Sequence, residues 1–400
     1  MAKAASDFKL LAWRVILVVA GAGLVWVAFR DASLAVMRNF AEQTGQATTS
    51  DPWVRVLAIR RIGEDGAPAA IEEGARDAAR QALIERPLGP EAIWLLQPQQ
   101  AGQSERDAAV LKLSERVSRR DLATQLGLAR FEAEQQNLER SVAHIDRILR
   151  VAARGAGPLH ANLALGLDNP ELRTLLVPYK DRVWMKAVLA AAFGAGPKPE
   201  SVAEFVKLAR FPAEVLHDAK LDRLLRRLTA TGNFTDAYDV ARLAGYGGLN
   251  DPRDFGVSET TMDQRFAPLT WGLGNSDAVS ASFPDNAGIL AEVQPGKGDL
   301  LATRSTAYPT GAYRLEMDLV VEDAPAGIDV SWSMTCITPQ GALRPVRQDQ
   351  LIKGPPQRIA VDITIPANCL VQTWSIRASN LNNQLTASLQ VRKIGLIKPV

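Results

Sequence analysis

The sequence has few of the residues from which metal and thiol sites are built. Its 400 residues include only two cysteines and three histidines. Zinc sites need Cys and His ligands at close, regular spacing, and His144, His160 and His217 are scattered, with no His-Glu-x-x-His segment among them. The sequence therefore predicts no metal and no other cofactor.

The chain also lacks an excess of charge of either sign. Lys and Arg total 46 and Asp and Glu total 44, so the formal net charge is +2. A nucleic-acid-binding domain normally carries a strong positive field, so nucleic acid is not expected as a partner. Neither the Gly-x-x-x-x-Gly-Lys-Ser/Thr phosphate loop nor a Gly-x-Ser-x-Gly nucleophile segment occurs. Without a recognisable catalytic constellation, the sequence predicts a non-enzymatic protein.

One apolar run is long enough to cross a bilayer. It extends from Leu10 to Phe29 and contains a single charge, Arg14. A helix of about 20 residues spans the hydrocarbon core, and Lys3 and Lys9 before it favour a cytoplasmic N-terminus. We therefore predict a cytoplasmic tail at 1–9, a transmembrane anchor at 10–29, and a single-pass bacterial inner-membrane protein whose C-terminal bulk is periplasmic. A cleaved signal peptide is the alternative.

Residues 31–255 have the pattern of short amphipathic helices. Apolar residues recur at intervals of three and four, as in the alanines at 75, 78, 79 and 82, and Gly-Pro segments at 86–90 and 155–158 interrupt the pattern. Segments 107–111 and 141–145 are related by an offset of 34 residues. The region is therefore predicted to be a helical repeat domain made of antiparallel hairpins.

These hairpins resemble tetratricopeptide-like repeats. The resemblance implies a curved solenoid with a concave face for a protein partner. Charged residues at one predicted helix end are the candidate partner-binding residues: Arg116, Arg119, Arg120 and Asp121. The alternative is that these residues form an ordinary solvated helix end.

Residues 260–400 have the pattern of strands. In Tyr313 to Leu319, apolar residues alternate with polar ones, as expected for a half-buried antiparallel sheet. The sequence predicts a C-terminal β-sandwich of jelly-roll type. Its eight predicted strands are 279–283, 289–293, 300–305, 313–321, 328–338, 357–365, 370–378 and 386–397.

Three tryptophans of the predicted sandwich are candidate ligand-binding residues. Sandwiches of this type often bind carbohydrate, and Trp271, Trp332 and Trp374 could stack on sugar rings. The alternative is that each tryptophan fills the core between the sheets, since Trp332 and Trp374 lie within continuous strand patterns.

Both cysteines, Cys336 and Cys369, lie in the predicted sandwich. In an oxidising periplasm they would form one disulfide between strand ends, and a loop of 33 residues would contribute about 3 kcal/mol. Two unrelated buried thiols are the alternative.

The anchor, the hairpins and the sandwich together resemble membrane-tethered periplasmic proteins of bacterial cell-envelope and exopolysaccharide systems. The resemblance implies an adaptor whose partners are the membrane, other cell-envelope proteins and polysaccharide, with the repeats binding protein and the sandwich binding glycan or protein. One alternative is a glycan-processing hydrolase or lyase with an unrecognised carboxylate site. Another is a structural scaffold of division or secretion machinery.

Overall fold

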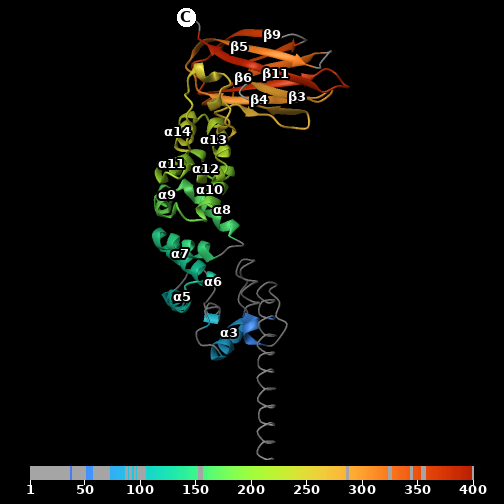
Figure 1. Ribbon diagram of the computed structural model, residues 1–400. Coiled ribbons are helices and arrows are strands. Elements are labelled where there is room, and N and C mark those ends of the chain that lie inside the picture. Colours follow the sequence, from blue (N-terminus) through green and yellow to red (C-terminus); the bar gives the residue numbers. More distant parts are fainter. Residues whose placement is uncertain are drawn as a thin grey trace, which may run out of the picture. The chain divides into compact units, whose positions relative to one another are not determined.

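A computed structural model describes the chain in ranges. These are residues 37, 51–56, 73–85, 89, 92–93, 96, 105–151, 156–284, 288–322, 327–342, 346–352 and 357–398. The chain forms two compact units, Met1–Gly155 and Ala156–Val400. Figure 1 shows their helices and strands.

The first unit is helical. Its described helices are α3 (Glu73–Glu85), α5 (Glu105–Val117), α6 (Leu122–Glu134) and α7 (Leu138–Val151). The alanines Ala78, Ala79 and Ala82 of α3 are fully buried and pack with Trp53, because small side chains allow close approach. Helices α6 and α7 pack together across a three-residue connection, as the sequence predicts for a hairpin.

The second unit begins with further helical hairpins. Their helices are α8 (Gly157–Leu165), α9 (Pro170–Leu176), α10 (Met185–Gly194), α11 (Pro199–Ala209), α12 (Ala213–Asp218), α13 (Leu221–Ala230) and α14 (Phe234–Leu243). Helix α11 packs against α9, α13 and α14, while α10 packs against α8, α12 and α13. Leu221, Leu224, Leu225 and Leu228 of α13 are buried at the spacing of one helix face.

Ion pairs join successive hairpins at a nearly constant sequence separation. Arg173 pairs with Glu204 at 2.6 Å across 31 residues, and Lys207 pairs with Asp236 at 2.7 Å across 29. In a stack of repeats each unit contacts its neighbour in the same way, which gives such a constant separation. The helical hairpins are therefore present, whereas their assignment to the tetratricopeptide class stays a prediction.

The rest of the second unit is a β-sandwich of two antiparallel sheets (Figure 1). One sheet has the order β1-β4-β10-β6-β7, with β8 also paired to β6, and the other has the order β2-β3-β11-β5-β9. Successive strands from β3 to β6 alternate between the sheets, as do β8 to β11, so the strand order agrees with the predicted jelly roll. The strands are β1 (Gly272–Leu273), β2 (Val279–Ser282), β3 (Ile289–Val293), β4 (Gly298–Thr306), β5 (Gly311–Glu322), β6 (Ile328–Thr338), β7 (Gly341–Ala342), β8 (Val346–Ile352), β9 (Gln357–Ile365), β10 (Val371–Asn380) and β11 (Ala387–Ile397).

The sequence missed one sandwich strand of substantial length, β8. Its segment VRQDQLI is mostly polar and pairs with β6 alone, so its side chains are largely exposed. A strand at a sheet edge needs no alternating apolar face, and the period-two pattern is therefore weak there.

The predicted fold class and location need a correction at the N-terminus. Within the described ranges, no helix is both long and apolar enough to cross a bilayer. The segment 10–29, for which the sequence predicts the anchor, lies outside these ranges. The prediction of a single-pass inner-membrane protein is therefore corrected, because the described helices do not support it. The length of the apolar run and the basic residues before it suggested the anchor, and these local features do not by themselves specify a membrane span.

Candidate functional site

The three tryptophans proposed as sugar platforms are core residues. Trp271, Trp332 and Trp374 are 1%, 3% and 2% exposed. The Trp271 indole N–H donates to the Phe255 carbonyl at 3.1 Å, and that of Trp374 donates to Thr306 Oγ1 at 2.8 Å. A sugar ring cannot reach a buried indole face, so the prediction of a tryptophan platform is wrong and the core alternative is confirmed.

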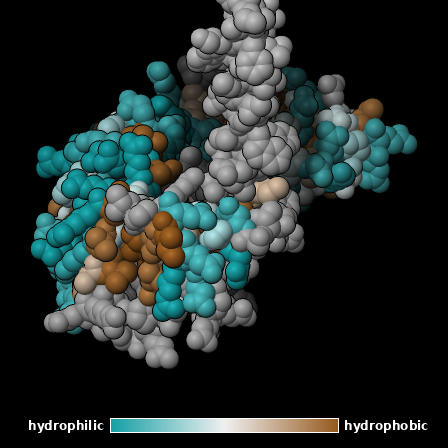
Figure 2. Space-filling model, turned by 90° about the horizontal axis from the view of Figure 1, so that it is seen from below, coloured by the Kyte–Doolittle hydropathy of each residue, from teal (hydrophilic) through white to brown (hydrophobic). Residues whose placement is uncertain are grey.

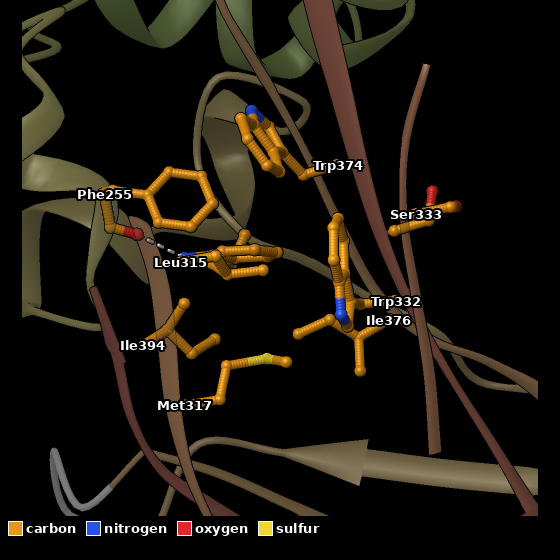
Figure 3. Close-up of a pocket in the computed structure, with 10 residues that line it drawn as sticks. Phe255, Leu315, Met317, Trp332, Ser333, Trp374, Ile376 and Ile394 are labelled. Carbon is orange, nitrogen blue, oxygen red and sulfur yellow. Dashed lines mark hydrogen bonds between the residues drawn. The ribbon is translucent and has the colours of Figure 1, made fainter. Parts of the chain in front are cut away.

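The space between these tryptophans is too small for a sugar. The cavity has a volume of about 10 Å³, and Phe255, Leu315 and Met317 line it with the tryptophans. Figure 3 shows the side chains converging on this space from both sheets. A volume of this size holds at most one water molecule. The Trp332 indole N–H, which has no partner among the described residues, is the group such a water would satisfy.

The four predicted partner-binding residues divide into two kinds. Arg116, Arg119 and Arg120 are exposed at the end of α5 and in the turn after it. Asp121 is 6% exposed and caps α6, where its Oδ2 accepts a hydrogen bond from the Thr124 N–H at 2.8 Å. Because an N-cap aspartate satisfies free backbone donors, Asp121 is a structural residue and its prediction as a partner-binding residue is corrected. The three arginines remain available at the surface.

The outer face of the β4-β10-β6 sheet carries a group of hydroxyl side chains that we term the hydroxyl block. It comprises Ser333 and Thr335 of β6 and Thr373 and Ser375 of β10. Ser375 is directly opposite Ser333 and Thr373 is directly opposite Thr335, so the four side chains share one face. All four are partly exposed, and their hydroxyls have no hydrogen-bond partner in the described part of the chain. Figure 3 shows the Ser333 hydroxyl pointing away from the tryptophan cluster.

A charged pair lies beside the hydroxyl block. Arg377 follows Ser375 by two residues on the same face of β10 and is exposed, with its Nη1 3.7 Å from Asp299 Oδ1 of β4. A hydrogen bond from the Leu300 N–H lowers the pKa of Asp299, with smaller contributions from Ser276 and Arg377. The carboxylate is therefore ionised near neutral pH, and the face offers hydroxyls, a guanidinium and a carboxylate together.

The outer face of the opposite sheet has a different chemistry. Glu316 of β5 accepts a hydrogen bond from Arg358 of β9 at 2.5 Å, and Arg314 lies 3.9 Å from the same carboxylate. The Glu316 carboxylate is thus paired with two guanidinium groups. The hydroxyl block is thus the better candidate for binding a neutral, hydroxyl-rich ligand.

A second polar group is buried within the first unit, among α5, α6 and α7. The His144 Nδ1 lies 2.7 Å from Gln125 Oε1, and Ser114 Oγ lies 2.7 Å from Thr124 Oγ1. Arg147 forms an ion pair with Glu115 beside His144. Burial lowers the pKa of His144, and the nearby Glu115 only partly opposes this effect. The group fixes the three helices together and has no described opening for a ligand, so we assign it a structural role.

Apolar side chains also reach the surface. Figure 2 shows hydrophobic residues gathered in one area of the face seen from below, bordered by hydrophilic ones. In the first unit Leu113 and Leu126 are about half exposed. Nothing in the described part of the chain indicates what would cover this area, and we give it no functional assignment.

The hydroxyl block was missed by the sequence analysis, although a signal for it exists. In Trp332 to Thr335 and again in Thr373 to Ile376, Ser and Thr alternate with large apolar residues. Once the tryptophans are placed in the core, their neighbours must face solvent. Their position opposite one another depends on strand pairing, which the sequence does not show.

Comparisons with known proteins give no family. No family model and no curated protein matches the sequence. Solved structures with limited similarity include TmCBM61 in complex with β-1,4-galactotriose, with 8% identity, 36% of this chain and 99% of that chain covered, and a TM-score of 0.27. A Family 16 Carbohydrate Binding Module-2 has 16% identity, covers 37% of this chain and 100% of that chain, and has a TM-score of 0.26.

The enzymatically active domain of tailspike protein 4 from bacteriophage CBA120 is also similar at a low TM-score. Its identity is 12%, it covers 37% of this chain and 22% of that chain, and the TM-score is 0.27. TM-scores this low cannot identify a ligand. The chain is thus a two-unit protein with a terminal antiparallel β-sandwich, and its function must be argued from its own geometry.

Proposed function

We propose that this chain is a non-enzymatic binding protein whose β-sandwich binds a glycan through the hydroxyl block. The observation that carries the proposal is the pairing of Ser333 with Ser375 and of Thr335 with Thr373 on one partly exposed face. Hydroxyl side chains both donate and accept hydrogen bonds, and a sugar presents the same groups. Arg377 adds a guanidinium with several donors at the edge of the block.

The helical hairpins are proposed to bind a protein, so that the chain acts as an adaptor. Stacked hairpins bury their apolar faces on each other and leave a lateral face free. Arg116, Arg119 and Arg120 are exposed on such a helix end. The cell-envelope and exopolysaccharide setting depended on the predicted anchor, and we do not include it in this proposal.

Glycan binding can be tested with the full chain and a panel of neutral and acidic polysaccharides, measured by isothermal titration calorimetry. The double substitution Thr335→Val and Thr373→Val removes two hydroxyls while keeping the side-chain shape. We expect it to weaken binding at least 10-fold, because each hydrogen bond contributes about 1 kcal/mol. Thr364→Val on the exposed outer side of β9 is the matched control and should bind as the unmodified protein does.

Three results would contradict the proposal: no binding to any polysaccharide, equal binding by the double variant, or release of shortened products from the bound glycan. The last result would favour the enzyme alternative. The adaptor half is tested separately by reversing the charge of Arg116, Arg119 and Arg120. In crosslinking experiments on the full chain, that variant should no longer be crosslinked to the protein partner of the helical hairpins, while its affinity for glycan should stay unchanged.

A further inference from the structure

Arg304 is a buried cation at the junction between the helical hairpins and the sandwich. It lies on β4 and is only 2% exposed. Within the described residues, no carboxylate forms an ion pair with this guanidinium. A buried guanidinium is costly unless its donors are satisfied. The groups that accept hydrogen bonds from Arg304 therefore show how the cost of burying its charge is offset.

The donors of Arg304 bind the segment that connects the helices to the sandwich. Nη1 donates to the Asp254 carbonyl at 2.6 Å, and Nε donates to the Leu269 carbonyl at 3.0 Å. Burial raises the pKa of Tyr246, just after α14, and the nearby Arg304 guanidinium partly opposes this effect; the guanidinium also lies 6.0 Å from the centre of the Phe255 ring. One side chain thus hydrogen-bonds two separate points of the connecting segment and contacts the Phe255 ring between them in sequence.

The connecting segment in turn packs on the helices. Phe266 contacts His217 of α12 at a ring separation of 5.2 Å and Tyr246 at 5.1 Å. Outside this packed region, Asn250 donates to the Ala307 carbonyl at 3.0 Å and accepts from the Ala307 N–H. A continuous set of contacts therefore runs from β4 through Arg304 to the helical hairpins.

We propose that Arg304 is a positioning residue that fixes the helical hairpins on the sandwich. Surfaces on the two parts are thereby held at one distance and orientation, so a ligand on the sandwich and a partner on the hairpins of this unit are presented together. Because backbone carbonyls accept both hydrogen bonds of Arg304, these two bonds do not depend on which side chains the segment carries. The inference does not depend on which ligand the sandwich binds.

The test is a distance measurement in the full chain. Spin labels are placed at Glu214→Cys on α12 and Asp362→Cys on β9, both exposed, and double electron–electron resonance gives the distribution of distances. The native cysteines are paired and do not react. We expect a single narrow distribution in the unmodified protein. Arg304→Met should broaden it at least twofold, and Arg304→Lys should give an intermediate width.

Arg358→Met is the matched control, because it removes an exposed arginine from the opposite sheet. Its distribution should stay narrow. An Arg304→Met protein that keeps the circular dichroism spectrum of the sandwich and also keeps the narrow distribution would overturn the proposal. If Arg304→Met does not fold, the conservative variant Arg304→Lys, which keeps the charge but loses the forked donors, decides. Broadening there supports the proposal, and an unchanged distribution refutes it.

Discussion

At the scale of single residues, burial separates neighbours with different roles. Trp332 and Ser333 are adjacent in sequence, yet the indole of Trp332 is 3% exposed in the core and the Ser333 hydroxyl faces away from it. The same division separates Trp374 from Thr373 and Ser375. A strand places successive side chains on opposite faces, so a residue's type indicates its role only once its face is known.

His144 provides a prediction at this scale. Burial lowers its pKa below the usual 6.5, whereas the unfolded chain has the ordinary value. As the pH falls below about 6.5, the unfolded state binds a proton before the folded state does, so stability decreases. We expect His144→Gln to remove up to about 1 kcal/mol per pH unit of this dependence between pH 6.5 and 5.

The measurement is urea unfolding of the full chain at several pH values, followed through helical circular dichroism. The difference between the two proteins isolates the histidine from the carboxylates, which both proteins share. Parallel pH profiles would show that His144 does not titrate differently in the folded and unfolded states.

At the scale of elements, the pairing of β6 with β10 carries both the candidate site and the disulfide. Cys336 and Cys369 are bonded with an S–S distance of 2.21 Å, as the sequence predicts. Cys336 lies late in β6 and Cys369 lies just before β10. The bond therefore closes the connection that leads from one of these strands to the other.

Replacing both cysteines by serine should lower the free energy of unfolding of the sandwich by about 3 to 4 kcal/mol, because the unfolded chain regains the entropy of a 33-residue loop. Chemical denaturation of the Cys336→Ser, Cys369→Ser protein measures the loss. The unmodified protein in excess dithiothreitol is the control and should lose a similar amount. Equal stability of the oxidised and substituted proteins would show that the crosslink does not constrain the unfolded state.

At the scale of the whole molecule, the helical hairpins from α8 onward and the sandwich belong to one compact unit, Ala156–Val400. The sequence changes from helical to strand periodicity near residue 255, and a boundary between 255 and 260 was expected there. Arg304 and the segment it binds cross that position. The helical and strand regions are thus in contact across this position, and the predicted division between them stays a prediction.

A shortened chain of residues 156–400 should therefore fold and bind glycan as the full chain does. Both the hydroxyl block and the contacts of Arg304 lie within it. Calorimetric melting and glycan titration of the two proteins provide the comparison. A chain that begins at residue 256, as the sequence boundary suggests, serves as the control and should be less stable because it lacks Asp254, Phe255 and Tyr246. If the longer fragment aggregates while the shorter one folds, the assignment of units is wrong.

Periodicity in the sequence determined most elements of this protein. The strands Ile289–Val293, Ile328–Thr338 and Gln357–Ile365 begin and end where alternation predicts, and the helix at Leu221 follows its apolar spacing. These features are local, because one buried face imposes a period of 2 or 3.6 on the sequence. The sequence also predicted the disulfide, because both cysteines lie in the predicted sandwich.

Only the tertiary structure decided which residues come together in the candidate site. The hydroxyl block exists because β6 and β10, about 40 residues apart in sequence, pair in one register. Arg304 acquires its role from carbonyls that lie 35 and 50 residues away in sequence. Backbone carbonyls have no sequence signature, and a strand pairing shifted by one residue would place the same hydroxyls in the core. Long-range pairing therefore decided the candidate site, while local patterns decided the elements that carry it.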